Sequence, residues 1–430
     1  MQTTFTEEQL ADPRNRSSEA ILRRCVHCGF CTATCPTYVL LGDELDSPRG
    51  RIYLIKDMLE NDRQPTADTV KHIDRCLSCL SCRTTCPSGV DYMHLIDHGR
   101  EVVEERYRRP LLDRLYRSMI AVLVPRPGLF RLAMVAGWFA RPFRRLVPGR
   151  LGAMLALVPS RIDPASSVDR PQVFPAEGPR RRRVALMTGC AQQALRPAIN
   201  EATVRLLTRL GCEVVIADGM GCCGALEHHM GRTGPSHQAA KKNIEAWERA
   251  GRDGGELDAI VVNASGCGTT VKDYGYMLAN DPEWAERAER ISALAQDITE
   301  VLVGAELPVA DADGLKPVVA YHSACSMQHG QGISGPPVEL LRRAGFEVRQ
   351  PAEGHLCCGS AGSYNMTQPG IAARLGKRKA ANLAATGADV VASGNIGCQM
   401  QIGLHGDLAV CHTVELLDWA TGGPKPDGVA

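Results

Sequence analysis

Cys25-Val-His-Cys28-Gly-Phe-Cys31-Thr-Ala-Thr-Cys35-Pro is the first of two cysteine runs that decide the fold of this chain. The second is Cys76-Leu-Ser-Cys79-Leu-Ser-Cys82-Arg-Thr-Thr-Cys86-Pro. Both follow the spacing C-x2-C-x2-C-x3-C-P, in which three thiolates hold one [4Fe–4S] cube and the fourth ligates the other cube of a two-cluster ferredoxin. The spacing therefore predicts two [4Fe–4S] clusters with crossed ligands. One set is Cys25, Cys28, Cys31 and Cys86, and the other is Cys76, Cys79, Cys82 and Cys35.

Zinc is the main alternative to iron and sulfide, because zinc modules also use C-x2-C pairs. Zinc takes four ligands in two pairs, and two runs of three plus one do not divide in that way. The sequence also has no C-x2-C-H motif for covalent haem. The runs thus favour an electron carrier.

Composition places the chain among ordinary globular proteins. A length of 430 residues predicts two or three domains. The 49 basic and 48 acidic residues nearly balance, which gives no argument for nucleic acid. Eighteen cysteines indicate metal sites rather than disulfides, since iron-binding thiolates must stay reduced. With no secretory signal and no apolar run of about 18 residues, we expect a cytoplasmic protein.

Helices are expected around the cysteine runs. Apolar residues recur at helical spacing over 50–61, and a second helix is expected over 69–74. We therefore predict an α-helical ferredoxin domain over residues 1–105. Arg49 and Arg51 flank Gly50 between the runs, where contact with an anionic cluster and simple solvation are both open.

Residues 106–183 are expected to form a basic, apolar helical segment followed by a linker. Residues 100–150 contain twelve Arg, no Lys and four acidic residues, and prolines divide them into short helices. Such segments lie on anionic membranes or against partner subunits, although bridging helices with solvated charges are the alternative. Five prolines between 159 and 179, without strand or helix periodicity, predict the linker.

The remainder of the chain is an internal duplication. Val184-Ala-Leu-Met-Thr-Gly-Cys190 parallels Val318-Val-Ala-Tyr-His-Ser-Ala-Cys325, and Gly221-Cys222-Cys223-Gly224 parallels Leu356-Cys357-Cys358-Gly359, both at an offset of 135 residues. A third pair, ending at Cys267 and Cys398, has an offset of 131 residues. Each copy alternates short apolar runs with helical stretches, so a βαβαβ unit with a parallel sheet is predicted over 184–305 and again over 316–420.

The cysteines of each copy follow directly after the apolar runs. Because parallel strands end at one edge of a sheet, we expect them to converge there as cofactor-binding groups. The first group is Cys190, Cys222, Cys223 and Cys267, and the second is Cys325, Cys357, Cys358 and Cys398. Cys212 matches Phe346 in the other copy, and Cys411 matches no cysteine, so both are expected in the core. The histidines near these edges are expected to be ordinary hydrogen-bonded side chains, with a proton-handling role toward a quinone as the alternative: His228, His229, His322, His355 and His412.

Several stretches resemble the iron–sulfur subunits of bacterial glycolate oxidase (glycolate dehydrogenase), namely residues 25–38, 40–56, 264–268 and 355–362. The resemblance implies separate flavoprotein (FAD) subunits that oxidise glycolate to glyoxylate, while this chain carries electrons to a quinone-type acceptor and is inactive alone. It also implies a place at the inner face of the cell membrane. The Cys-Cys-Gly repeat is shared more widely, with heterodisulfide reductase, lactate-utilisation proteins and anaerobic glycerol-3-phosphate dehydrogenase.

One departure from the heterodisulfide reductase pattern leaves alternatives open. That module closes with C-x2-C, whereas Thr270 and Gln401 stand at the last position here. An additional iron–sulfur centre in the repeats, a shared centre or no metal are therefore all open. The substrate of the complex is also open, with lactate or glycerol 3-phosphate as alternatives to glycolate. The repeat could instead form a thiol–disulfide enzyme or a metal-free scaffold that docks the flavoprotein. No flavin or nicotinamide motif occurs in the chain.

Overall fold

The N-terminal region is built from short helices around a small apolar core. The computed structural model describes residues 1–147, 149–309 and 316–429. The core includes Leu22, Ile55 and Leu95, all without solvent exposure. The helices are α1 (Glu7–Ala11), α2 (Pro13–Arg24), α3 (Phe30–Ala33), α4 (Pro36–Leu41), the 3₁₀ turn η1 (Glu44–Asp46), α5 (Pro48–Glu60), α6 (Ala67–Asp74), α7 (Ser81–Thr85) and α8 (Tyr92–Arg106). The predicted helical character of this region is confirmed, with α5 and α6 at the expected places.

Local capping explains where these helices begin. Ser47 precedes α5 and its side chain accepts the Gly50 N–H, while Pro48 occupies the first helical position. Thr66 caps α6 in the same way through the Thr69 N–H. The starting points of α5 and α6 are therefore determined by the sequence between the cysteine runs. These helices hold the two runs side by side.

The basic segment forms a helical bridge with an exposed apolar side. Its elements are α9 (Leu111–Leu123), α10 (Pro127–Ala140), η2 (Arg141–Leu146) and α11 (Gly149–Leu157). In the described part of the chain no single helix is long and apolar enough to span a membrane. Helix α9 and the helical stretch Pro127–Arg144 would together have the length and composition of a membrane span, but they are bent by 118° against each other. Twelve large apolar side chains between 111 and 151 are exposed, out of twenty among the described residues.

The first repeat contains a five-stranded sheet in the order β1-β3-β2-β4-β5. Its elements are β1 (Gln172–Phe174), β2 (Arg182–Met187), α12 (Ala191–Leu195), α13 (Ala198–Arg209), β3 (Cys212–Ile216), α14 (Ala225–His229), α15 (Thr233–Gly254), β4 (Ala259–Val262), α16 (Ser265–Lys272), α17 (Tyr274–Met277), α18 (Ala285–Leu294), β5 (Ala295–Asp297) and α19 (Ile298–Val303). Strands β2 to β5 are parallel, and β1 pairs antiparallel with β3.

The second repeat contains a parallel sheet in the order β7-β6-β8-β9, which repeats the order of β3-β2-β4-β5. Its elements are β6 (Val319–Tyr321), the short π-helical turn η4 (Ser326–Gly330), α20 (Pro336–Arg343), β7 (Val348–Arg349), α21 (Tyr364–Thr367), α22 (Pro369–Ala384), β8 (Val390–Ala392), α23 (Ile396–His405), β9 (Ala409–Cys411) and α24 (Thr413–Ala420). The predicted duplication is thus visible as two sheets of the same topology.

Two features differ from the sequence prediction. Each copy has a fourth parallel strand, β5 or β9, that was not predicted, because three residues are too short to show periodicity. The stretch 159–179 was expected to lack regular structure, yet it contributes β1 and the 3₁₀ turn η3 (Ser167–Asp169). The register pairs Val173 with Val215, so part of the expected linker extends the first sheet.

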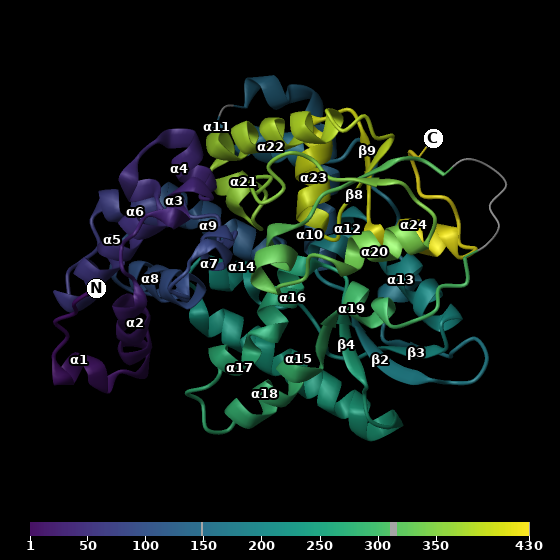
Figure 1. The fold of residues 1–430 in the computed structure, drawn as a ribbon, viewed down its shortest axis with the longest axis horizontal. Coiled ribbons are helices and arrows are strands. Elements are labelled where there is room, and N and C mark those ends of the chain that lie inside the picture. Colours follow the sequence, from purple (N-terminus) through teal and green to yellow (C-terminus); the bar gives the residue numbers. More distant parts are fainter. Residues whose placement is uncertain (148, 310–315, 430) are drawn as a thin grey trace.

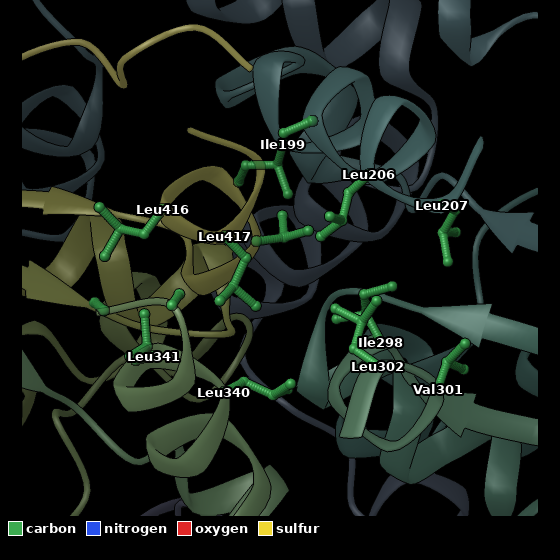
Figure 2. Close-up of a cluster of buried hydrophobic side chains, with 14 of the residues drawn as sticks. Ile199, Leu206, Leu207, Ile298, Val301, Leu302, Leu340, Leu341, Leu416 and Leu417 are labelled. Atoms are coloured by element: carbon green, nitrogen blue, oxygen red, sulfur yellow. The ribbon is translucent and has the colours of Figure 1, made fainter. Parts of the chain in front are cut away.

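The two repeats share one apolar core. Helix α13 packs against α24, and α20 packs against α19, so matching helices of the two copies exchange partners. Figure 2 shows their leucine, isoleucine and valine side chains meeting from all four helices. The N-terminal helices lie at one end of the molecule in Figure 1, and the repeats together with the bridging helices α10 and α11 occupy the rest. The shared core fixes the cysteine edges of both copies relative to each other.

Candidate metal centres

The first predicted ligand group meets in one hollow. Cys25, Cys28 and Cys31 line it together with Cys86, which arrives from the second run. Helices α3 and α7, which contain the third cysteines of the two runs, Cys31 and Cys82, pack against each other. The structure therefore brings together the four thiols that the spacing assigned to one cluster.

The two cysteine runs adopt the same unusual backbone. His27 and Ser78, each two residues after the first cysteine of its run, have φ of 62° and 48°. Gly29 and Leu80, each following the second cysteine, have φ of 87° and 61°. Non-glycine residues rarely adopt positive φ, and such strain persists where the surrounding structure requires it. Turns of this kind can point backbone N–H groups toward a common centre, where they bind an anionic group.

The second predicted ligand group is more deeply buried. Burial, together with neighbouring Cys79, Cys76 and Cys35, raises the pKa of the Cys82 thiol well above its usual value. Several donors approach these sulfurs: the Ser78 N–H lies 3.5 Å and the Tyr92 hydroxyl 3.8 Å from Cys76 Sγ. Thiol ligands with hydrogen bonds to sulfur fit an iron–sulfur cluster, whose potential such bonds tune. Cys82 also lines the first hollow, so the two groups are adjacent.

Arg51 is buried against this second group, which decides one of the open alternatives. Its guanidinium lies 3.9 Å from Cys35 Sγ and 3.3 Å from the carboxylate of Asp46. Asp46 also contacts His72 at 2.9 Å and Arg75 at 2.7 Å. Arg49, in contrast, is partly exposed and pairs with Glu44 at 2.5 Å. Arg51 is therefore placed to act on the charge of the buried second group, while Arg49 lines the hollow of the first group.

The cysteines of the two repeats occupy matching positions at the sheet edges. Cys222 and Cys357 each accept the N–H of the glycine two residues later, at 3.5 and 3.4 Å. Those glycines, Gly224 and Gly359, have φ of 87° and 90°. A Cβ at Gly359 would lie 2.7 Å from the Ala372 carbonyl oxygen, so the turn requires glycine. In the first copy Cys222 contacts the thiols of Cys190 and Cys223, which shows the expected convergence.

The remaining cysteines lie in the core, as predicted. Cys212 on β3 and Cys411 on β9 are 4% and 1% exposed and belong to the shared apolar cluster. Phe346, the counterpart of Cys212, belongs to the same cluster.

The histidines near the sheet edges divide into two kinds. The Nε2 atom of His412 lies 2.7 Å from the Asn263 carbonyl oxygen, and that of His228 lies 3.2 Å from the Asp97 carboxylate, as expected for hydrogen-bonded side chains. The expectation is wrong for His322, and the buried Nδ1 of His229 also lacks a hydrogen-bond partner among the described residues. Neither ring nitrogen of His322 has a hydrogen-bond partner in the described part of the chain.

The N-terminal region contacts both repeats by different means. On the first repeat, His94 lies 2.9 Å from Asp273 and stacks on Tyr276 with ring centroids 3.4 Å apart. On the second repeat, Leu77 and Cys79 pack into one buried cluster with Cys357. Sequence reasoning missed His94 and Asp273, because isolated histidines and aspartates carry no spacing signal.

Comparisons with known proteins agree with this division. The family model described as a 4Fe-4S dicluster domain matches residues 21–90, and the one described as a cysteine-rich domain matches 184–272 and 319–403. The glycolate oxidase iron-sulfur subunit of Escherichia coli (strain K12) is 43% identical over 420 residues, 98% of this chain and 99% of that protein. The probable glycolate oxidase iron-sulfur subunit of Bacillus subtilis (strain 168) is 32% identical and covers 97% of this chain and 99% of its own length.

Two further matches are more distant. Lactate utilization protein A of Bacillus licheniformis is 30% identical over 243 residues, which are 55% of this chain and 99% of that protein. A crystal structure of a hypothetical protein from Helicobacter pylori superimposes with a TM-score of 0.57 at 10% identity, over 96% of this chain and 73% of that one. The latter likeness concerns the fold alone.

Proposed function

This chain belongs to the family of the glycolate oxidase iron–sulfur subunits, and from this premise we propose that it binds two [4Fe–4S] clusters and transfers electrons. The electrons come from flavoprotein (FAD) subunits that oxidise glycolate, and they leave to a quinone-type acceptor. The chain is inactive without those partners, because it has no motif for flavin or nicotinamide.

The supporting observation is the crossed meeting of the two cysteine runs. Cys86 of the second run enters the hollow lined by Cys25, Cys28 and Cys31. Cys35 of the first run lies among the buried thiols of the second. This is the arrangement that the two-cluster ferredoxin spacing requires, with one ligand of each cluster supplied by the other run.

The residues around the sulfurs suit an electron carrier. When bound, an iron–sulfur cluster supplies one-electron exchange at a potential set by charge, hydrogen bonds and exposure. Arg51 places a buried positive charge near Cys35, and Tyr92 directs its hydroxyl at Cys76. The first hollow is the more exposed of the two, since Cys28 lies at the surface. The flavoprotein would therefore dock over Cys28, and electrons would pass inward.

In the second repeat the burial of three cysteines favours electron transfer over thiol–disulfide catalysis, whereas Cys222 of the first repeat is partly exposed and hydrogen bonds from Cys190 and Cys223 hold its pKa well below the usual value. Cys357, Cys358 and Cys398 are at most 5% exposed, so a disulfide substrate cannot reach their sulfurs. A catalytic thiol needs access and a lowered pKa, whereas burial and neighbouring thiols raise the pKa of Cys358 well above its usual value. Lactate is the alternative substrate of the complex, because the Bacillus licheniformis relative is named for lactate utilization.

The exposed side of the basic segment suits contact with an anionic membrane surface. Leu112, Phe139 and Leu146 are 80%, 68% and 78% exposed. Arg108, Arg114, Arg126 and Arg144 belong to the same segment. An apolar surface fringed with arginine binds interfacially through burial and attraction to anionic lipids. The proposed location is therefore peripheral on the inner face of the cell membrane, close to a quinone acceptor.

Iron analysis of cysteine variants tests the cluster assignment. Cys86→Ala and Cys35→Ala, purified without oxygen together with the flavoprotein subunits, should each lose about four irons per chain and one paramagnetic resonance signal. Cys212→Ala is the matched control and should keep the full content, because Cys212 lies in the apolar core. Colourless wild-type protein, or zinc in place of iron, contradicts the proposal.

Vesicle sedimentation tests the location. The wild-type chain should bind vesicles containing phosphatidylserine and release them at high salt. Replacing Leu112 and Phe139 by Glu should abolish binding, while Val309→Glu, outside the segment, should not. Binding that persists in the double variant rejects this surface as the membrane contact.

A further inference from the structure

A cleft of about 560 Å³ lies where the two repeats meet the end of the helical bridge, and the proposed function does not use it. Its walls come from the end of α11 and the residues after it, from α12 and α13 of the first repeat, from α23 and α24 of the second, and from residues 424–427 near the C-terminus. Pockets that bind small molecules have volumes of about 300–1,000 Å³ and often lie between domains. The size and the position of this cleft therefore suit a ligand.

Part of the cleft is an apolar wall that is open to solvent. We use the term apolar wall for Leu157 and Val158 at the end of the bridge and for Met400 and Leu404 on α23. Leu404 is 38% exposed, although its side chain is apolar. Gly403 also lines the cleft, and a Cβ at this position would meet no atom within 4 Å. The apolar body of a ligand would therefore pack against the wall without displacing protein atoms.

The buried part of the cleft contains an acceptor without a donor. Gln399 lines the cleft and is 3% exposed. Its side-chain Nε2 donates to the Ser393 carbonyl oxygen at 2.9 Å, which fixes the orientation of the amide. The other amide atom, Oε1, is buried and has no hydrogen-bond partner among the described residues. Buried acceptors are nearly always satisfied, and a ligand hydroxyl in the cleft would donate to this one.

The charges around the cleft are balanced, which favours a ligand without net charge. Arginine and lysine supply five of the lining residues, and aspartate and glutamate supply five others. The two buried carboxylates already have cationic neighbours: Asp418 lies 2.7 Å from Arg205, and Glu415 lies 3.7 Å from Arg196. A charged head group would be desolvated here without a free counter-charge. A neutral group that donates a hydrogen bond matches the cleft better.

The cleft lies beside the exposed apolar side of the bridge. Ser160 lines the cleft, and its carbonyl oxygen accepts a hydrogen bond from Trp138 Nε1 at 2.8 Å. Trp138 on α10 is 44% exposed, and Leu151 on α11 is 53% exposed. Arg141, which follows α10 directly, is itself part of the lining. A molecule with an apolar tail would therefore reach the cleft from the same surface that suits a membrane.

We propose that this cleft binds a neutral amphiphile, with a hydroxyl-bearing head hydrogen-bonded to Gln399 Oε1 and a tail packed along the apolar wall. Two kinds of membrane molecule have this chemistry. One is a reduced quinone, whose ring carries two hydroxyl groups, and the other is a glycerolipid with free hydroxyl groups. No cysteine is among the described residues that line the cleft, so the site is separate from the thiol groups of the proposed function.

Equilibrium dialysis of the full chain, purified without oxygen, tests the binding. The two probes are decylhydroquinone and 1-decanoylglycerol, each compared with its O-methyl derivative, which keeps the tail but cannot donate a hydrogen bond. Wild-type protein should bind one equivalent of a hydroxylated probe, and the probe that binds more tightly identifies the source. The O-methyl derivative of that probe should bind about 2–10-fold more weakly, because it cannot donate to Gln399. Wild-type protein that binds neither probe overturns the proposal.

Two glycine variants test whether the ligand occupies the cleft. Gly403→Leu should fold at least as stably as wild type, because leucine favours a helix and the position is open. Its side chain would fill space beside the apolar wall, so binding should weaken by about tenfold or more. Gly251→Leu is the matched control on α15, outside the cleft and also in open space, and it should bind like wild type. Unchanged affinity in Gly403→Leu contradicts binding in this cleft.

Variants of Gln399 test the hydrogen bond to the head group. Gln399→Leu removes the acceptor, so the hydroxylated probe and its O-methyl derivative should bind with equal affinity. Gln399→Glu keeps an acceptor oxygen and should keep the preference for the hydroxylated probe. A preference of the same size in wild type and Gln399→Leu would show that Oε1 does not contact the ligand, and it would overturn the proposed mode of binding.

Discussion

Replacement of His94 by Gln should weaken the contact between the N-terminal region and the first repeat, but only below about pH 9. The imidazole lies 2.6 Å from Asp91 on one side and 2.9 Å from Asp273 on the other. Burial lowers the pKa of His94, but the two carboxylates outweigh burial and raise it to about 9. The ring therefore carries a positive charge at neutral pH.

The magnitude follows from this pKa. Movement from the ordinary value of 6.5 to about 9 corresponds to about 3 kcal/mol of stability. Burial raises the pKa of Asp273, which offsets part of this gain, so about 1–3 kcal/mol remains. Because the folded pKa is the higher one, the contribution is complete below pH 6.5 and is lost as the pH rises through 9.

Hydrogen exchange measures this effect locally. Peptides covering α8 and α17 should exchange about 10–100-fold faster in His94→Gln than in wild type at pH 6.5, after correction for intrinsic rates. The ratio should fall toward one near pH 10. His237→Gln is a suitable control, because burial lowers the pKa of His237 to about 4 and the residue does not titrate in this range. A ratio for His94→Gln that does not change with pH refutes the reasoning.

Three further predictions concern the thiol sites. Arg51→Met should lower the potential of the cluster at Cys35 by about 50–100 mV in a redox titration, since it removes a buried positive charge near the sulfur, while Arg51→Lys should lower it less. Gly359→Ala should cost about 1–3 kcal/mol because of its positive φ and the Ala372 oxygen at 2.7 Å, whereas Gly370→Ala, with open space around it, should be neutral in thermal melting. Cys411→Ser should lower the melting temperature and leave iron content unchanged, since it places a hydroxyl in the apolar core.

The sequence predicted which thiols lie together where spacing and repetition constrain them. The spacing of the cysteine runs indicated that Cys86 would meet the first run, as it does in the hollow lined by Cys25, Cys28 and Cys31, because ligand geometry limits the spacing. The duplication separated Cys212 from the cysteines at the sheet edges, because the other copy has Phe346 at that place. Neither cysteine spacing nor the duplication predicts the contacts of single residues whose partners are distant in the chain. Arg51 could not be assigned to a cluster or to solvent until its burial against Asp46 was visible.

The unpartnered ring of His322 is a second example of a residue whose surroundings could not be predicted from the sequence. In the sequence it was one of five histidines near the sheet edges, and an ordinary hydrogen bond was the reasonable expectation. Only the structure shows that His412 has such a bond and that His322 has none among the described residues. Short strands β5 and β9 were missed for a related reason, because pairing with a neighbouring strand, rather than local pattern, defines them.

The two repeats have kept one fold but contact the N-terminal region through different chemistry. The first repeat offers charged partners, with Asp273 facing His94 and His228 facing Asp97. The second offers an apolar and sulfur-rich surface, where Cys357 packs beside Cys79. Raising the pH should therefore loosen the first contact and leave the second in place. Burial lowers the pKa of His329, whose Nδ1 lies 2.7 Å from the Thr84 hydroxyl, so the second contact keeps its hydrogen bond without a proton on that nitrogen and does not weaken as the pH rises.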